Sequence, residues 1–305
     1  MSSSPQLVHA EAMPMQTDTF GIPAREDVLF TDAKGHPHKG IRRSSEKILR
    51  ELGEPLRHCL RKGEVVFYAA TMTAPLSGLE QFTMSWWLYG TYSTVLVFTS
   101  ERLLAFPVER SGQWRQSIQS VELGDIEQAK TGGIISRTLT IRTKDGRKDV
   151  FQRLHVRDAK KLKVLIPILL QGKSATTANG WQSLCPQCLG HLTPGHYSCP
   201  GCNLQFRSEQ KLARRILIPG GGYFYIGLTG AGIVAVLLEA IFYIELLGGI
   251  LLLSAPKQAQ DRTDGVAVLF GFGIFIGLEK LIMYMHARRF IRWFLPEGKL
   301  QPKVG

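Results

Sequence analysis

"CPGCNLQFRSEQKLARRILIPGGGYFYIG" spans Cys199 to Gly227 and joins two kinds of segment that differ in chemistry. Its first four residues form a Cys-x-x-Cys pair, which is the spacing of a metal-binding turn. Its end begins a long apolar run that continues to Ser254. The sequence therefore predicts a small metal-binding module directly before a membrane region.

The composition of the chain indicates an anionic partner. The 305 residues carry a formal net charge of +12, and Lys and Arg are concentrated before the apolar run that starts at Ile216. Such a charge suits either a membrane surface or a nucleic acid. Basic residues beside membrane spans are also the usual signal of membrane orientation. The composition therefore favours the membrane as partner, with nucleic acid as the alternative.

Four of the five cysteines form two Cys-x-x-Cys pairs separated by ten residues. Four thiolates complete the closed tetrahedral shell that Zn²⁺ prefers in structural sites, so we expect structural rather than catalytic zinc. An iron site of the rubredoxin kind would use the same ligands. A redox pair would need a βαβ setting, which neither pair has. The predicted metal ligands are Cys185, Cys188, Cys199 and Cys202.

The chain before the cysteines changes its apolar pattern twice. Residues 1–40 are rich in Ser, Pro, Gly and His and are expected to form a flexible leader. Residues 41–62 have the apolar spacing of an amphipathic helix, and Pro55 predicts a break or kink in it. Between residues 63 and 172, short runs of β-branched and aromatic residues predict strands followed by one helix. A polar linker at 173–182 then leads to the cysteine module at 183–207. The helix has a predicted buried stripe of Ala159, Leu162, Ile166 and Leu169, opposite Lys160, Lys161 and Lys163.

Three stretches of the strand region carry a family resemblance: "LVFTSERLLAF" (96–106), "SIQSVELGDIEQA" (117–129) and "LTIRTKDGRKDVFQ" (139–152). Their order resembles the bacterial pleckstrin-homology-like and GRAM-type domains, which contain a Thr-x-x-Arg-Leu turn and a hairpin around a Gly. Ser100 stands where many members carry Asp. The resemblance implies a small barrel closed by a C-terminal helix. The cysteine module is similar to the small zinc ribbons, and "PGGGYFYIG" (219–227) resembles the signature of a two-helix membrane domain family.

The apolar run after the cysteines is too long for one helix across about 30 Å of hydrocarbon. We expect an interfacial or re-entrant segment at 212–228, transmembrane helices at 229–254 and 265–286, and a basic cytoplasmic tail at 287–305. Lys and Arg flank both outer ends, which places both termini in the cytoplasm. The predicted fold class is a multi-domain protein of the inner (cytoplasmic) membrane. It combines a PH-like β-barrel with a C-terminal helix, a small zinc ribbon and an α-helical transmembrane hairpin.

Three glutamates, Glu239, Glu245 and Glu279, fall inside or at the edge of these spans. A charged side chain in hydrocarbon is costly, so each is expected to have either a function or an internal partner. The functional alternative is an ion or proton pathway. The structural alternative is a protonated Glu bonded across the hairpin, or Glu279 placed beside Lys280 near the interface. Glycines in both spans would allow close packing in a hairpin or a homo-oligomer.

The sequence has no phosphate-binding loop, nucleophile elbow or His-x-x-Glu pair, and we expect no enzyme activity. We expect a membrane-anchored adaptor or scaffold that binds lipid head groups or a protein partner at the cytoplasmic face, through the zinc ribbon or the barrel. The alternatives are a subunit of a transport or ion-conducting complex, and a nucleic-acid-binding protein that uses the ribbon. A basic hairpin in the barrel is either a lipid-binding surface or a solvated strand edge, and its residues are Arg142, Lys144, Arg147, Lys148 and Arg153.

Overall fold

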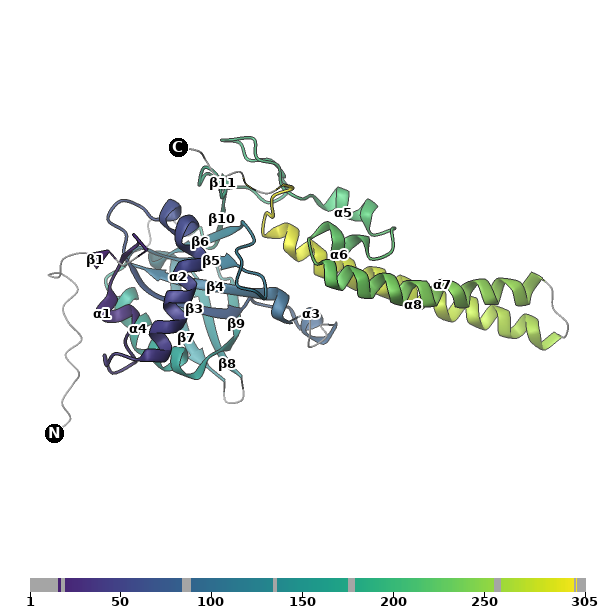
Figure 1. Cartoon of the computed structure of the whole chain (residues 1–305), viewed down its shortest axis with the longest axis horizontal. Coiled ribbons are helices and arrows are strands. Elements are labelled where there is room, and N and C mark those ends of the chain that lie inside the picture. Colours follow the sequence, from purple (N-terminus) through teal and green to yellow (C-terminus); the bar gives the residue numbers. More distant parts are fainter. Residues whose placement is uncertain are drawn as a thin grey trace. The chain divides into compact units, whose positions relative to one another are not determined.

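The protein, seen here as a computed structural model, divides into two units (Figure 1). The first consists of Met1–Leu204 with Leu300–Gly305, and the second of Gln205–Lys299. The structure describes residues 16–17, 20–83, 89–133, 136–174, 179–254, 259–298 and 300. Strands dominate the first unit, where β-branched and aromatic residues recur, and helices form the second. The elements of the first unit are β1 (Gln16–Thr17), β2 (Pro23–Ala24), α1 (Glu26–Leu29), α2 (Lys39–Cys59), β3 (Val66–Thr73), α3 (Gly78–Thr83), η1 (Tyr89–Tyr92), β4 (Ser93–Thr99), β5 (Arg102–Pro107), β6 (Ile118–Glu122), η2 (Leu123–Asp125), β7 (Ile126–Gly132), β8 (Arg137–Thr143), β9 (Lys148–Leu154), α4 (Val156–Leu170), β10 (Gln182–Leu184) and β11 (His191–Leu192).

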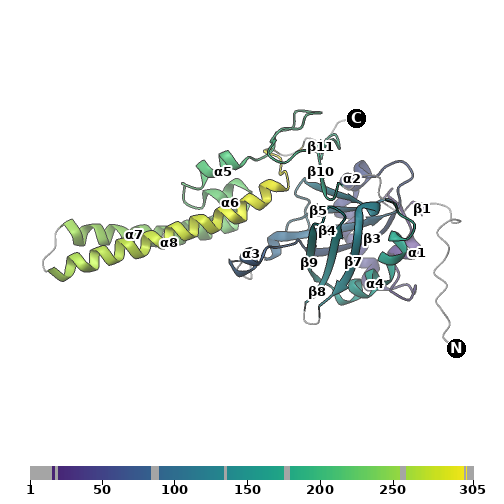
Figure 2. The same cartoon turned by 180° about the vertical axis from the view of Figure 1, so that it is seen from behind.

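Nine strands of the described first unit pair antiparallel in the order β11-β10-β6-β5-β4-β3-β9-β8-β7, and β2, which pairs with β1, joins β3 in parallel. Strand β3 joins two groups of sequential strands, because it pairs with β4 of the group β4–β6 and, at Thr73↔Gln152, with β9 of the group β7–β9. Figure 2 shows α4 lying along β7 and β8. The apolar stripe predicted for α4 is buried, since Ala159, Leu162, Ile166 and Leu169 all belong to the core. An antiparallel sheet domain with a C-terminal helix is therefore present.

The N-terminal segment needs a correction. Over its described residues the predicted leader is folded, because β2 pairs with β3 and α1 follows it. Ile22, Ala24 and Leu29 are fully buried. Their irregular spacing among turn residues gave no period that would reveal them in the sequence. Helix α2 also continues through Pro55 rather than ending there.

Lys161 is a second correction, since it is buried rather than on the solvent side of α4. Its ammonium group donates hydrogen bonds to the carbonyl oxygens of Val28 and Thr31 and to Thr31 Oγ1. It also lies 5.4 Å from the centre of the Tyr68 ring. Burial lowers the pKa of Lys161 to about 8. The residue fastens the folded N-terminal segment to α4.

The Thr-x-x-Arg-Leu turn between β4 and β5 contains a buried ion pair. Arg102 Nη2 lies 3.0 Å from Glu64 Oε2, and Thr99 Oγ1 donates to Glu64 Oε1 at 2.6 Å. Arg102 Nη2 also donates to the carbonyl oxygen of Cys59 at the end of α2. Both charged side chains are almost completely buried, at 5% and 0% exposure. This turn therefore joins α2 to three strands of the sheet.

The second unit is a long helical hairpin with a folded base. Two short helices precede the hairpin, and after it the chain returns to the base, where Pro296 bridges to Phe206. The rings of Phe206 and Phe294 meet edge to face, with centroids 5.6 Å apart. The predicted tail at 287–305 therefore needs correction for its described residues 287–298, which belong to the last helix and this base. The helices are α5 (Glu209–Arg215), α6 (Gly221–Tyr225), α7 (Thr229–Ser254) and α8 (Ala259–Arg292).

Glycines allow α6 to approach the hairpin closely. Gly220 has a left-handed φ of 62°, and a Cβ there would collide with the carbonyl oxygen of Gly232 in α7. A Cβ at Gly222 would lie 2.8 Å from Met283 Cγ in α8. The Pro-Gly-Gly-Gly stretch thus allows α6 to pack closely against both α7 and α8.

We predict that Arg102→Leu lowers the free energy of unfolding of the first unit by about 3–5 kcal/mol, because it leaves the Glu64 carboxylate buried without its partner. Hydrogen exchange of the β4 and β5 amides in the full chain would measure the loss. The double variant Glu64→Leu/Arg102→Leu should recover much of the stability. Equal stability of the single and double variants would contradict this role of the pair.

Candidate metal centre

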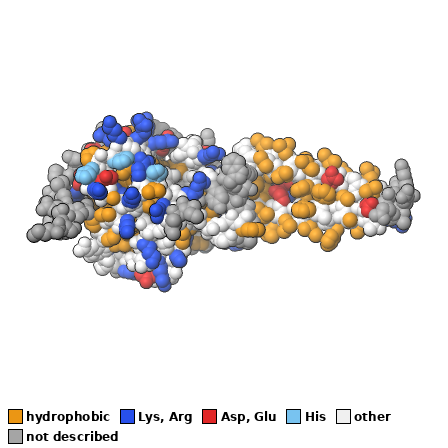
Figure 3. All heavy atoms as spheres, turned by 90° about the horizontal axis from the view of Figure 1, so that it is seen from below, with side chains coloured by type: hydrophobic (Ala, Val, Ile, Leu, Met, Phe, Trp, Pro, Cys, Tyr) orange, Lys and Arg blue, Asp and Glu red, His pale blue; other side chains and the backbone are white. Residues whose placement is uncertain are grey.

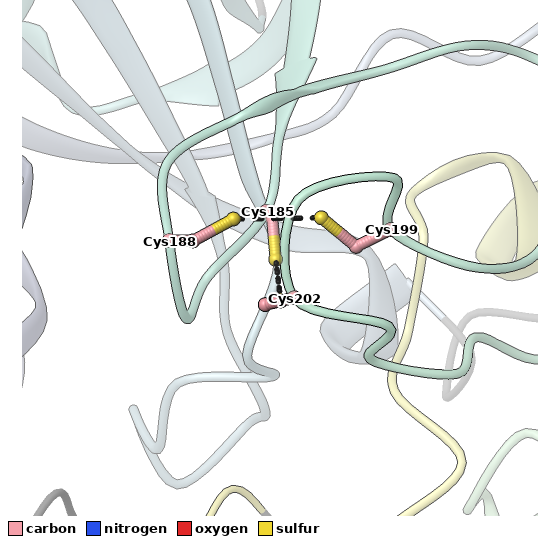
Figure 4. A group of neighbouring side chains, drawn as sticks. All are labelled: Cys185, Cys188, Cys199 and Cys202. Atoms are coloured by element: carbon pink, nitrogen blue, oxygen red, sulfur yellow. Dashed lines mark hydrogen bonds between the residues drawn. The ribbon is translucent and has the colours of Figure 1, made fainter.

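The four cysteines of the two Cys-x-x-Cys pairs converge on one point (Figure 4). Their Sγ atoms all lie within 4.8 Å of one another. Cys185 and Cys202 are 3.6 Å apart, and Cys188 and Cys199 are 3.4 Å apart. Each close contact joins the two pairs, so both pairs contribute to one cluster.

The two pairs have the same backbone geometry. The N–H of Leu189 donates to the carbonyl of Cys185, and the N–H of Asn203 donates to the carbonyl of Cys199, both at 2.9 Å. Leu189 and Asn203 each have a left-handed φ of 60°. The N–H of Cys185 in turn donates to Gly190, and that of Cys199 to Leu204. Each pair is therefore a tight turn whose two thiols point to the same side.

The sulfur geometry fits a tetrahedral metal ion. With metal–sulfur bonds of about 2.3 Å, the sulfurs of a tetrahedral site lie about 3.8 Å apart, close to the contacts found here. The same contacts are far longer than a disulfide bond of about 2.05 Å, and all four thiols are free. His191 and His196, which lie between the pairs, are exposed and do not belong to the cluster. The four thiols could therefore bind a metal ion such as zinc.

The thiols differ in their surroundings. Burial opposes ionisation of Cys199, but hydrogen bonds from the backbone N–H groups of Cys202 and Gly201 and from the thiols of Cys188 and Cys185 together lower its pKa to about 7. Burial raises the pKa of Cys185 well above the usual range of a thiol. A bound cation would stabilise all four thiolates together.

The cysteine cluster directly follows a strand of the sheet of the first unit and is not a separate module. Strand β10 ends at Leu184, one residue before Cys185, and pairs with β6 from Gln182↔Ser120 to Leu184↔Ile118. The Trp181 ring lies 6.0 Å from that of Phe151 in β9. The described part of the predicted linker therefore leads directly into a strand of the sheet.

The predicted basic hairpin is partly neutralised by its own domain. Arg142 pairs with Glu127 at 3.0 Å, and Arg147 with Asp149 at 2.9 Å. Lys144, Lys148 and Arg153 are exposed. Ion pairs within the domain reduce the charge that this surface could offer to lipid phosphate.

The three glutamates of the long helices have different surroundings. Glu239 is fully buried, accepts the N–H of Gly220 at 2.9 Å and pairs with Lys280 Nζ at 2.6 Å. Glu245 is exposed on α7. Glu279 is half-buried, and its Oε2 has no hydrogen-bond partner among the described residues.

The pairing of Glu239 with Lys280 was not foreseen, although the sequence holds a signal for it. Between the predicted spans 229–254 and 265–286 the connection is centred between residues 259 and 260, so positions 239 and 280 lie about 20 residues from the turn on opposite helices. Opposite charges at equal depth in two apolar helices predict an ion pair. A Glu bonded across the hairpin was one of the expected arrangements, but Lys280 was expected beside its neighbour Glu279.

No family model matches the chain, and no curated protein matches it. Among solved structures, the chain is similar to the C-terminal domain of an unknown protein from Leishmania infantum at 13% identity. The match covers 43% of this chain and 99% of that one, with a TM-score of 0.26. A likeness at this level carries no argument about fold or function.

We predict that Cys199→Ser/Cys202→Ser abolishes bound metal, since two thiolates cannot complete a tetrahedral shell. Elemental analysis of the purified full chain should find about one equivalent of zinc in the original protein and none in the variant. Cys59→Ala is the matched control, because Cys59 belongs to the apolar core and is not one of the four clustered thiols, so the variant should leave the metal content unchanged. Metal retained by the double variant would refute the site.

Proposed function

We propose that the chain is a non-enzymatic adaptor anchored in the inner (cytoplasmic) membrane by α7 and α8. The lateral surface of these helices carries the proposal, because large apolar side chains are exposed along both. Leu237 is 61% exposed, Leu251 69% and Phe270 73%. Hydrophobic side chains cover the face of the hairpin seen in Figure 3. Soluble monomers rarely expose a continuous apolar surface of this size.

The dimensions of the helices support the same proposal. Helix α7 has 26 residues and α8 has 34, which correspond to about 39 and 51 Å at 1.5 Å per residue. Both exceed the hydrocarbon thickness of about 30 Å. Both are long and apolar enough to cross a membrane.

The distribution of charge favours a cytoplasmic base for the hairpin. Lys211, Arg214 and Arg215 precede it, and Arg288, Arg289 and Arg292 lie at the end of α8. Lys and Arg near the ends of spans remain on the cytoplasmic side. We therefore place the N- and C-termini in the cytoplasm.

We assign the binding of partners to the first unit. Strands β3 to β9 followed by α4, with β3 paired to β9, agree with the PH-like and GRAM-like domain that the sequence resembles. Four cysteines with no open ligand position favour structural Zn²⁺. We propose that this zinc-stabilised sheet domain binds a protein partner or lipid head groups at the cytoplasmic face.

The transport alternative depends on the glutamates of the helices. Glu239 is neutralised by Lys280, which favours a structural role for that carboxylate. Glu245 and Glu279 are not held by such a pair in the described residues and are the groups that a transport complex would use. Nucleic-acid binding through the cysteine module has no specific observation in its favour.

We predict that the full chain remains in membranes washed with alkaline carbonate. Ile241→Lys/Ile244→Lys should reduce integration, because both exposed side chains lie near the middle of α7 and Lys near the centre of a span costs about 2.5–3.5 kcal/mol. Phe82→Lys is the control, since Phe82 is 89% exposed but lies in α3 of the first unit. Release of the original chain by carbonate would contradict membrane anchoring.

We predict that partners recovered with the intact chain from solubilised membranes are lost with Cys199→Ser/Cys202→Ser. They should be kept with Glu245→Gln/Glu279→Gln, because an adaptor does not use these carboxylates. Quantitative mass spectrometry of the captured proteins measures both. The reverse result, together with lost ion flux in the glutamate variant, would favour the transport complex.

A further inference from the structure

The base of the second unit contains an open pocket of about 690 Å³. It is formed by α5, by α6 and by the segments on either side of the hairpin. Four of its lining side chains are cationic, namely Arg207, Lys211, Arg214 and Arg215, and one is the carboxylate of Glu297. The pocket therefore has a strong excess of positive charge.

Most of this charge is not neutralised by the protein. Glu297 is occupied by Lys211, whose Nζ lies 2.6 Å from Oε1. Arg214 and Arg215 are exposed and form no ion pair within the described residues. Arginine remains protonated at all physiological pH values. The guanidinium groups of Arg207, Arg214 and Arg215 therefore line the pocket and form no ion pair in the described part of the chain.

The guanidinium of Arg207 is held against an aromatic ring, and one of its nitrogens has no hydrogen-bond partner in the described part of the chain. Its guanidinium carbon lies 5.8 Å from the centre of the Tyr225 ring. Tyr225 is fixed in turn, because its hydroxyl accepts the N–H of Ser208 at 2.9 Å. Arg207 Nη1 is buried and has no hydrogen-bond partner among the described residues. Arg207 as a whole is only partly buried and lines the pocket, so an anion there would form charge-assisted hydrogen bonds with its guanidinium.

The other wall of the pocket is apolar. Ile218 is 52% exposed and Phe224 is 43% exposed beside the cationic groups. Ile233 and Leu237 continue an exposed apolar surface along α7. A small hydrophilic anion would leave this wall in contact with water, whereas an amphiphile would cover it. The combination suits a phosphate group joined to an acyl chain.

We propose that this pocket binds the phosphate of an anionic phospholipid from the cytoplasmic leaflet. The proposal rests on the membrane anchoring proposed above and adds a lipid site at the base of the second unit. The planar guanidinium groups of Arg207 and Arg215 bind phosphate oxygens, and Ile218 and Phe224 contact the acyl chains. Free phosphate shares the head-group chemistry and is the other source that the test must separate.

Native mass spectrometry of the full chain in neutral detergent, titrated with phosphatidylglycerol, measures the apparent affinity for one lipid. Arg207→Gln and Arg215→Gln should each weaken binding about tenfold, since each removes a charge-assisted hydrogen bond. Arg214→Gln/Arg215→Gln changes only exposed side chains and tests the pocket if Arg207→Gln fails to fold. The matched control is Arg292→Gln, an exposed arginine at the end of α8 outside the pocket. The control should change the affinity by no more than about twofold, because isolated surface charges contribute little.

Equal losses in the pocket variants and in Arg292→Gln would overturn the site, because they would indicate attraction to charge alone. Inorganic phosphate that binds as tightly as phosphatidylglycerol would overturn the lipid as ligand. Phosphatidylcholine with the same affinity would overturn the role of the anionic head group. Carbonate release tests membrane anchoring separately. A released chain that keeps arginine-dependent lipid binding would contradict the anchor while retaining the pocket.

Discussion

The second unit depends on one buried carboxylate. Glu239 accepts a hydrogen bond from the segment before α6 and pairs with Lys280 of α8, so one side chain joins three parts of the chain. In an apolar setting neither charge can be solvated by water, and each requires the other. The position of α6 depends on this contact, and α6 carries three of the residues that line the cationic pocket, Gly221, Phe224 and Tyr225.

Buried polar groups also join distant segments of the chain in the first unit. Glu64 and Arg102 connect the end of α2 to the turn between β4 and β5, and Lys161 holds the N-terminal segment against α4. The cysteine cluster joins two turns to the edge of the sheet. Apolar packing fills the space between elements, whereas these buried polar contacts determine which distant segments meet, because each leaves an unpaired group if it is misplaced.

Short sequence patterns predicted the clustered thiols and the buried face of a helix, but they did not predict which distant residues are in contact. The Cys-x-x-Cys spacing predicted the four clustered thiols, and the apolar period predicted the buried stripe of α4, because each depends on nearby residues. The burial of Lys161 and the pairing of Glu239 depend on segments far away in the chain. The pocket was also missed, since Arg207 and Phe224 are brought together only by the return of the chain at Gly220.

The pairing of β10 with β6 has a consequence for the solubility of the first unit. Without β10, the N–H and C=O groups along the outer edge of β6 would be unpaired, and such an edge is a template for pairing with other chains. Here β10 covers that edge, and β11, only two residues long, leaves little backbone for further addition. The turn that follows β10 is held by the cysteine cluster. Metal binding would thereby help to protect the sheet against aggregation.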